Sequence, residues 1–386
     1  MENTLSIDEV EALVVAAGGK DGDLLGVMER VGLPAVAALA VDELVFRCEP
    51  ANVDDEIFVR VDLVHRDHTF TEVLSVQNGQ PVRIARGDDA GTASARLEFR
   101  LPELLRLLYG RPRERHAGTH RTEVTHDGPW SSWPSVAAAL STIVHAVSSR
   151  PADLDRLAVR YGSDKFGAWH WFTPHYDRHF RHLKDDVVRV LEIGIGGYNH
   201  PGTGGGSLRM WKRYFTRGHV FGLDVYPKEG LDAPRLRTII GDQSDREGLL
   251  EIAERYGPFD VVIDDGSHIS DHVLTSFDVL FPHVRPGGYY VIEDLWTAYC
   301  PGFGGNADPA SSGATSLGLV KGLVDRLHYE EHSDGKPAGY PDENTVGLHV
   351  YHNMAVIEKG INAEGGIPSW VPRSYDELIP SAPHLK

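Results

Sequence analysis

The stretch VVRVLEIGIGG, residues 187–197, carries the strongest structural signal in this chain. Its first seven residues are mostly β-branched or leucyl, which is the composition of a strand buried on both faces of a sheet. The run then breaks into glycine, which permits a tight turn and lets a ligand approach the backbone without meeting a Cβ atom. A strand followed by a glycine loop is how an α/β sheet opens a pocket for a nucleotide-like ligand. An ordinary strand-to-helix turn is the alternative interpretation.

Two details of this stretch narrow its meaning. Glu192 lies inside the apolar run, where a carboxylate needs a specific role. The glycines that follow it do not have the G-x-G-x-x-G spacing of dinucleotide-binding proteins. The pattern resembles instead the first motif of class I S-adenosylmethionine-dependent methyltransferases. That resemblance implies that Glu192, Gly194 and Gly196 contact the cofactor.

From about residue 150 the sequence alternates between strand and helix patterns. The predicted strands are residues 187–193, 219–223, 238–240, 261–263 and 289–292, and the clearest predicted helices are residues 207–215 and 246–256. Such alternation gives a parallel sheet with right-handed crossovers, in which ligands bind at the carboxyl ends of the strands. The predicted fold class is therefore α/β, with a Rossmann-like domain.

The amino-terminal third of the chain has a different organisation. Residues 1 to about 45 have helical spacing, and residues 44–74 change to the period of strands with one wet face. Strand patterns at 82–87 and 93–99 precede a leucine-rich helix at 101–110, and the whole loosely resembles a sterol-carrier-like α+β fold. The polar run 111–134 is predicted to be a linker, and residues 135–150 a helix that leads into the next domain. We therefore predict an auxiliary α+β domain over residues 1–134 and a methyltransferase domain over residues 135–386.

Composition limits the class of partner. The chain has 386 residues and a formal net charge of −18, which argues against a nucleic acid or an anionic membrane as partner. Cys48 and Cys300 provide neither a disulfide framework nor a zinc-type spacing. No apolar run approaches the length of a membrane span. These features predict an acidic protein of the cytoplasm.

Further polar residues are candidates for the cofactor site. Asp224 ends the second strand and can accept hydrogen bonds from ribose hydroxyls, while Asp242 and Gln243, after the third strand, could reach an adenine edge. Ser163 lies in a polar segment that could form a lid, and Ser207 could cap the next helix and bind the carboxylate of the cofactor. The alternatives are a helix cap for Asp224, a turn residue for Asp242 and a hydrated helix–loop segment around Ser163.

Four carboxylates follow the fourth and fifth strands. Residues 259–268 read FDVVIDDGSH, and residues 287–294 read GGYYVIED. Crowded anions are costly unless a cation neutralises them, and oxygen ligands without cysteine suit Mg²⁺ first. The sequence therefore predicts a metal site among these carboxylates, the alternative being ordinary polar residues at strand ends.

His268 lies three residues beyond Asp265, at the mouth of the same strand. A histidine there can act as a general base, because its unperturbed pKa lies near neutral pH. Capping of the following helix is the alternative.

Four motifs occur together in the carboxyl-terminal part of the chain. They are GSDK at 162–165, LEIGIGG at 191–197, DDGSH at 264–268 and ED at 293–294. Over roughly residues 155–385 the set resembles the metal-dependent macrolide sugar O-methyltransferases, in particular the mycinamicin and tylosin tailoring enzymes that methylate a deoxyallose hydroxyl.

The resemblance implies a function and a site. The function is Mg²⁺-dependent transfer of a methyl group from S-adenosylmethionine to a deoxysugar hydroxyl of a macrolide glycoside, by a homotetramer. The implied metal ligands are Asp265, Glu293 and Asp294, and His268 is the implied base. Asp264 joins the cofactor-binding residues named above.

Three alternative functions agree less well with the sequence. A catechol-type methyltransferase uses similar carboxylates but a planar phenolic acceptor. A nucleotide-dependent oxidoreductase needs the G-x-G-x-x-G motif, which is absent after residue 193. A carrier of apolar ligands would suit the amino-terminal domain but leaves the acidic cluster unexplained.

Overall fold

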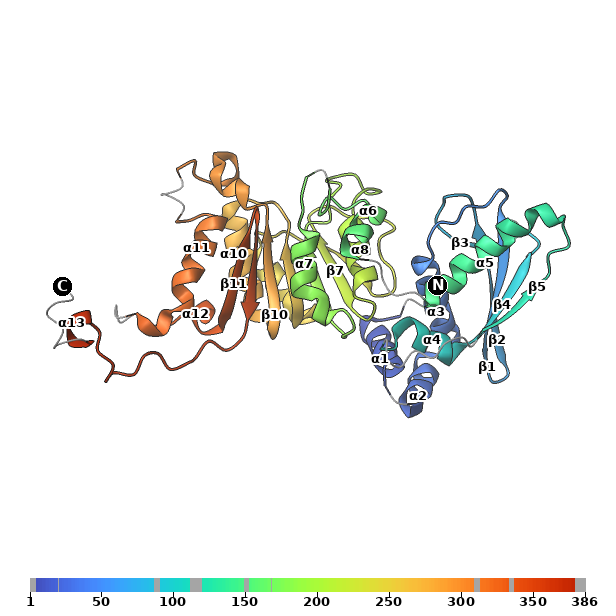
Figure 1. Ribbon diagram of the computed structural model, residues 1–386, viewed down its shortest axis with the longest axis horizontal. Helices are drawn as coiled ribbons and strands as arrows, with labels where there is room; N and C mark the ends of the chain where they lie inside the picture. The colour runs from blue at the N-terminus through green and yellow to red at the C-terminus, as the bar shows by residue number, and fades with distance from the viewer. Residues whose placement is uncertain are drawn as a thin grey trace. The chain divides into compact units, whose positions relative to one another are not determined.

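A computed structural model describes residues 5–19, 21–86, 91–111, 120–148, 153–167, 169–308, 313–332 and 337–378. These residues contain a five-stranded sheet and a seven-stranded sheet, each accompanied by helices (Figure 1). The chain divides into two compact units. The first contains residues 1–188, 195–222 and 226–239, and the second contains residues 189–194, 223–225 and 240–386.

The described part of the chain starts with three helices, in agreement with the helical spacing of residues 1 to about 45. α1 (Ile7–Ala17) starts with a capping box, in which Glu9 N donates to Ser6 Oγ and Ser6 N donates to the Glu9 carboxylate. α2 spans Asp21–Val31, and α3 spans Leu33–Arg47 with a proline in its first turn. The strand pattern expected from residue 44 is wrong at its start, because the helix continues to Arg47 and the first strand begins at Ile57.

The first sheet has the strand order β3-β2-β1-β4-β5. Its strands are β1 (Ile57–His65), β2 (His68–Val76), β3 (Arg83–Ala85), β4 (Ala95–Arg100) and β5 (His120–Val124). β1 pairs antiparallel with β2 and parallel with β4, and β5 pairs antiparallel with β4. The predicted linker is therefore wrong over residues 120–124, which form an edge strand, while residues 112–119 lie outside the described part of the chain.

Two helices cover this sheet. α4 (Leu101–Tyr109) and α5 (Trp133–Ser148) both pack against β1 (Figure 1). The buried face of α5, which includes Val136 and Ile143, belongs to the same hydrophobic core as the strands and α1–α4. α5 is therefore part of the amino-terminal body, and the domain boundary after residue 134 stays a prediction.

The seven-stranded sheet has the order β11-β12-β10-β9-β6-β7-β8. Its strands are β6 (Arg189–Ile193), β7 (His219–Asp224), β8 (Leu236–Ile240), β9 (Phe259–Asp264), β10 (Val284–Glu293), β11 (Thr345–Tyr351) and β12 (Met354–Lys359). β9 pairs parallel with both β6 and β10, which confirms the predicted α/β class. The antiparallel pair β11–β12 on β10 is missing from the sequence prediction, so the sheet is mixed rather than wholly parallel.

The helices between these strands follow the predicted alternation. α8 (Gly206–Tyr214), α9 (Arg246–Tyr256) and α10 (Ser270–Leu280) lie between successive strands from β6 to β10. α6 (Leu154–Tyr161) and α7 (Thr173–Phe180) precede β6, α11 (Ser316–Leu327) and α12 (Tyr340–Asn344) lie between β10 and β11, and α13 (Tyr375–Leu378) follows β12. α9 has the predicted bounds, and α8 starts and ends one residue earlier than predicted. Among the described residues no single helix is long and apolar enough to cross a membrane. One pair, residues 23–31 with Leu33–Arg47, meets that test jointly across a 105° bend.

A buried cluster of charges lies inside the first unit. The Glu43 carboxylate accepts hydrogen bonds from Arg47 Nε at 2.8 Å and Arg235 Nη2 at 2.5 Å, and Lys212 Nζ lies 3.6 Å away. All four side chains are at most 3% exposed. Burial alone raises the pKa of Glu43, but Arg235, Lys212 and Arg47 together hold that pKa far below its usual range. One carboxylate thus offsets the desolvation of several cations on α3, α8 and the segment before β8.

Replacing Glu43 by glutamine is expected to lower the free energy of unfolding by about 3–5 kcal/mol, because it leaves buried cations uncompensated. Urea denaturation of the full chain measures this change. Glu49→Gln is the matched control, since the exposed Glu49 pairs with Arg160 at 3.2 Å and its loss should cost less than about 1 kcal/mol. Equal losses for the two variants would show that the buried cluster does not stabilise the unit.

Candidate functional site

The carboxyl ends of β6, β9 and β10 bring three acidic side chains together. Glu192 is the second-last residue of β6, Asp265 follows β9, and Glu293 is the last residue of β10. Asp264 lies opposite Ile193 on one side and opposite Ile292 on the other, so the three strand ends are level. One carboxylate oxygen from each of the three acids lies within 4.8 Å of the others.

A second group overlaps the first through Asp265. Asp265, His268 and Asp294 each place one ligand atom within 4.8 Å of the other two. His268 Nε2 lies 3.5 Å from Asp294 Oδ2 and 4.0 Å from Asp265 Oδ1. The imidazole and the Asp265 carboxylate are each 22% exposed, so solvent or a ligand can reach them. The structure therefore brings together the four residues for which the sequence predicts metal binding and base catalysis.

The donor set of these two groups fits a hard divalent cation. Neighbouring carboxylates disfavour each other's charged form unless a positive charge lies between them. Carboxylate oxygens are the ligands that Mg²⁺ and Ca²⁺ take in proteins. Glu192, for which the sequence predicts a cofactor contact, lies at the inner side of this cluster and is fully buried.

Two residues of the cluster have unusual backbone conformations. His268 has φ 56° and Asp294 has φ 51°, both in the left-handed region that residues other than glycine adopt infrequently. Such conformations persist only where the surrounding structure holds them, and they concentrate at functional sites. Thr297 supplies part of that support at Asp294, since its N–H and hydroxyl both donate to Asp294 O, at 3.0 and 2.8 Å.

Asp264 points into the interior, on the opposite side of β9 from Asp265. Its carboxylate accepts hydrogen bonds from Gln243 Nε2 at 2.6 Å, Ser276 Oγ at 2.5 Å and Tyr290 OH at 3.2 Å. Burial raises the pKa of Asp264 to about 6, against the opposing effect of these donors. Ser276 and Tyr290 are absent from the sequence prediction. The sequence offers one clue to these two residues, which is that each carries a hydroxyl among mostly apolar neighbours, Ser276 on α10 and Tyr290 on β10.

The predicted adenine contacts have different surroundings. Gln243 is buried, and its Oε1 accepts hydrogen bonds from Ser267 N and Ser267 Oγ at 3.0 and 3.2 Å. Asp242 is exposed, and its Oδ1 accepts from Ser244 N and Oγ at 2.8 and 2.7 Å, which is the contact of a turn residue. Asp224, partly exposed at the end of β7, accepts Gly241 N at its carbonyl. The ligand contacts of these residues stay predictions.

The glycine loop after Ile195 and the two predicted serines lie in the first unit. Gly196 has φ 72° and open space beyond its Cα, and Gly205 N donates to Ile195 O at 2.7 Å to close the loop. Gly205 is the N-cap of α8, so the expected capping by Ser207 is wrong, because Ser207 is the second helical residue. Ser163 follows α6 and is buried, and Lys165 N donates to its hydroxyl at 3.4 Å.

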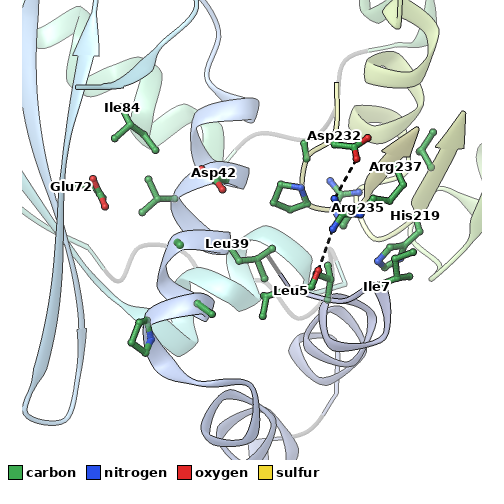
Figure 2. Close-up of a pocket in the computed structure, with 18 of the residues that line it drawn as sticks. Leu5, Ile7, Leu39, Asp42, Glu72, Ile84, His219, Asp232, Arg235 and Arg237 are labelled. Atoms are coloured by element: carbon green, nitrogen blue, oxygen red, sulfur yellow. Dashed lines mark hydrogen bonds and ion pairs between the residues drawn. The ribbon is translucent and has the colours of Figure 1, made fainter. Parts of the chain in front are cut away.

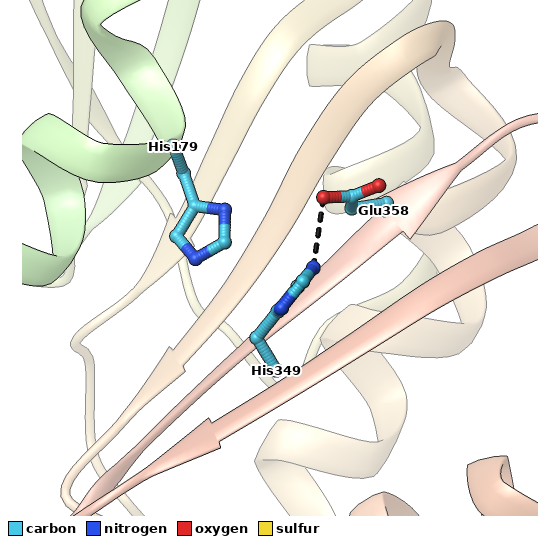
Figure 3. Close-up of side chains that lie close together, drawn as sticks. All are labelled: His179, His349 and Glu358. Carbon is cyan, nitrogen blue, oxygen red and sulfur yellow. Dashed lines mark hydrogen bonds and ion pairs between the residues drawn. The ribbon is translucent and has the colours of Figure 1, made fainter.

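Two features away from the acidic cluster complete the description. A cavity of about 860 Å³ in the first unit is lined by apolar side chains such as Leu39 and Ile84 and by paired charges such as Arg237 and Asp232 (Figure 2). On the edge of the second sheet, His349 Nε2 and Glu358 Oε1 are 2.8 Å apart across β11 and β12 (Figure 3). The latter has the geometry of a cross-strand pair that stabilises a sheet.

Comparison with known proteins gives matches over nearly the whole chain. Residues 10–120 match the family described as MycE methyltransferase N-terminal. The chain is 50% identical to demethylmacrocin O-methyltransferase of Streptomyces fradiae, with 96% of each chain covered. It is 49% identical to mycinamicin VI 2''-O-methyltransferase of Micromonospora griseorubida, covering 96% of this chain and 95% of that one.

A third relative is named for a different acceptor. The chain is 48% identical, over 94% of its length and 96% of the relative, to the 8-demethyl-8-(2-methoxy-alpha-L-rhamnosyl)-tetracenomycin-C 3'-O-methyltransferase of Streptomyces olivaceus.

The solved structures agree with these matches. The structure of the MycE methyltransferase from the mycinamycin pathway, in complex with Mg, SAH and mycinamycin VI, is 47% identical and matches 98% of this chain and 100% of its own with a TM-score of 0.89. A crystal form with Mg and SAH gives a TM-score of 0.91 over the same coverage. These matches confirm the predicted fold, an auxiliary amino-terminal domain followed by a Rossmann-like domain.

Replacing Gly194 by alanine is expected to distort the acidic cluster, because a Cβ at Gly194 would lie 2.0 Å from Asp265 O. Overpacking of this kind costs about 1–3 kcal/mol in addition to the strain of a positive φ. Gly230→Ala is the matched control, since Gly230 also has a positive φ but nothing within 4 Å of its Cβ position. Thermal unfolding should therefore show a larger loss for Gly194→Ala, and an equal loss would mean that the backbone at Asp265 moves freely.

Proposed function

The chain belongs to the family of metal-dependent macrolide sugar O-methyltransferases, and on this basis we propose that it methylates a deoxysugar hydroxyl of a macrolide glycoside. Its methyl donor is S-adenosylmethionine and its metal ion is Mg²⁺, in agreement with the SAH and Mg of the solved relative. The observation that carries the proposal is the acidic cluster with His268 at the strand ends. The matches to these relatives confirm the family and the reaction that the sequence motifs predict.

We assign the metal to Asp265, Glu293 and Asp294. Asp265 belongs to both groups of close ligand atoms, one with Glu293 and one with Asp294, which supports a single site. Mg²⁺ keeps several coordination positions for water or substrate oxygens, and three carboxylates leave such positions open. When bound, the cation stabilises the negative charge that develops on a hydroxyl oxygen.

We assign the cofactor to the strand-end and loop residues that the sequence predicts. The proposed contacts are Ser163, Glu192, Gly194, Gly196, Ser207, Asp224 and Asp242. Gly196 supports this assignment because its backbone is open to a ligand. Asp264 and Gln243 complete the predicted set, and their hydrogen bonds favour a role in supporting the site rather than in direct contact.

His268 is the proposed general base. A sugar hydroxyl is too weakly acidic to attack a methyl group at neutral pH without losing its proton. As the sugar oxygen bonds to the methyl carbon, the carbon–sulfur bond breaks, the sulfonium becomes a neutral thioether and the hydroxyl proton passes to His268. The distances of 3.5 and 4.0 Å from His268 Nε2 to the Asp294 and Asp265 carboxylates place this base beside the proposed metal ligands.

Two further assignments are parts of the proposal. The protein acts in the cytoplasm, which agrees with the free cysteines Cys48 and Cys300. It forms a homo-oligomer, a tetramer by the resemblance, through its amino-terminal domain.

Light scattering of the full chain should then give about four times the mass of one chain, and a monomer would contradict this assignment.

The acceptor is tested with the purified protein, S-adenosylmethionine and Mg²⁺. Mass spectrometry should detect one added methyl group on a macrolide glycoside, such as demethylmacrocin or mycinamicin VI. Little product is expected from a tetracenomycin rhamnoside or a catechol. Methylation of the rhamnoside alone would reassign the acceptor while keeping the reaction.

EDTA should abolish turnover and added Mg²⁺ should restore it, and full turnover with the chelator present would contradict the metal assignment.

His268→Ala in the same assay should lower kcat by about 10²–10⁴, the contribution of a positioned base. Calorimetric affinity for S-adenosylmethionine should stay near that of the unchanged protein. His349→Ala is the matched control, because this histidine pairs with Glu358 on the edge of the sheet. An undiminished kcat for His268→Ala would remove it from the mechanism.

A further inference from the structure

We propose that Ser267, held by Gln243 and His272, is a positioning residue that keeps the His268 imidazole beside Asp265 and Asp294. The inference rests on the proposed role of His268 as the base. It concerns three side chains that contact neither Asp294 nor the imidazole in the hydrogen bonds described. They act on His268 through the backbone on either side of it.

His268 needs such support because of its backbone conformation. Its φ of 56° lies in the left-handed region, which a β-carbon disfavours. A chain segment relaxes out of this region unless its neighbours fix it. Relaxation would carry the imidazole away from the carboxylates, because side-chain direction follows the backbone angles.

The hydroxyl of Ser267 spans the strained residue. Ser267 precedes His268 and its Oγ accepts a hydrogen bond from Ile269 N, the residue after it, at 3.3 Å. The same Oγ lies 2.9 Å from His272 Nδ1 and 3.2 Å from Gln243 Oε1. With one proton to give, Ser267 satisfies all three contacts if His272 Nδ1–H donates to it and it donates to Gln243.

Gln243 is itself held from the interior. Its Nε2 donates to Asp264 at 2.6 Å and to Ser276 Oγ at 3.2 Å, so Oε1 is left facing Ser267. Ser267 N also donates to that oxygen, at 3.0 Å. The carboxylate that anchors the network, Asp264, is almost fully buried.

The residue before Ser267 shows how closely this amide packs. A Cβ at Gly266 would lie 2.4 Å from Gln243 Oε1. Glycine at this position therefore leaves room for the Gln243 amide. Along the D-G-S-H sequence, Asp265 is the proposed metal ligand, Gly266 makes room for Gln243, Ser267 supplies the positioning hydroxyl and His268 is the proposed base.

The first test measures the imidazole without catalysis. In metal-free protein, the ¹⁵N resonances of His268, assigned by their loss in His268→Gly, should shift in Ser267→Ala and in Gln243→Leu. They should stay in place in Ser267→Thr, which keeps the hydroxyl. Unmoved resonances in Ser267→Ala would overturn the inference, and this holds whether or not the proposed acceptor is right.

The second test uses chemical rescue. His268→Gly removes both the side chain and the cost of a positive φ, and free imidazole should restore part of its methyl transfer. Ser267→Ala should lower kcat of the otherwise unchanged protein by about 10–100-fold, less than loss of the base itself. Its KM for S-adenosylmethionine should change by less than about twofold.

The comparison of the two backgrounds decides the inference. In the His268→Gly protein, Ser267→Ala should change the imidazole-rescued rate by less than about threefold, because no tethered base is left to position. An equal loss in both backgrounds would overturn the positioning role while leaving His268 as the base. Full activity of His268→Gly without imidazole would instead refute the proposed mechanism and the inference with it.

Discussion

Mutual repulsion of carboxylates at the ends of β6, β9 and β10 is the constraint on which the rest of the site depends. Three acidic side chains with oxygens within 4.8 Å of one another, and a fourth joined through Asp265, are unfavourable in a folded chain unless a cation lies among them. A divalent cation bound among the carboxylates removes this repulsion, because each carboxylate is then attracted to the cation. It also fixes where the acceptor oxygen lies, and hence where a base must stand. His268 Nε2 lies within 4.0 Å of both aspartates, which supports its proposed role as that base.

The support for this cluster comes from the other face of the same strand end. Asp264 and Asp265 are consecutive and point to opposite sides, so one enters the interior and the other the site. The interior carboxylate collects Gln243, Ser276 and Tyr290, and through Gln243 it reaches the loop that carries His268. A buried acid thus supports, through Gln243, the loop that carries the proposed base.

Part of this could be predicted from the sequence, for a physical reason. Carboxyl ends of neighbouring parallel strands meet at one edge of a sheet, so the DDGSH and ED motifs had to converge once the strands were recognised. The elements that the sequence prediction missed are those that depend on tertiary contacts. β5 pairs with β4 although its composition is that of a linker, and β11–β12 lack a β-α-β spacing. The proposed role of Gln243 depends on the close approach of its side-chain amide to the backbone at Gly266. The periodicity of strands and helices in the sequence does not reveal such a contact.

The claim that these carboxylates form one divalent-cation site is tested most directly by titrating the metal-free full-length protein with Mn²⁺ and following the free ion by electron paramagnetic resonance. The account predicts one tight site per chain, lost in Asp265→Asn and retained in Asp271→Asn, whose side chain is an exposed acid outside the cluster. Absence of a tight site in the unchanged protein, or unaltered binding in Asp265→Asn, would contradict it.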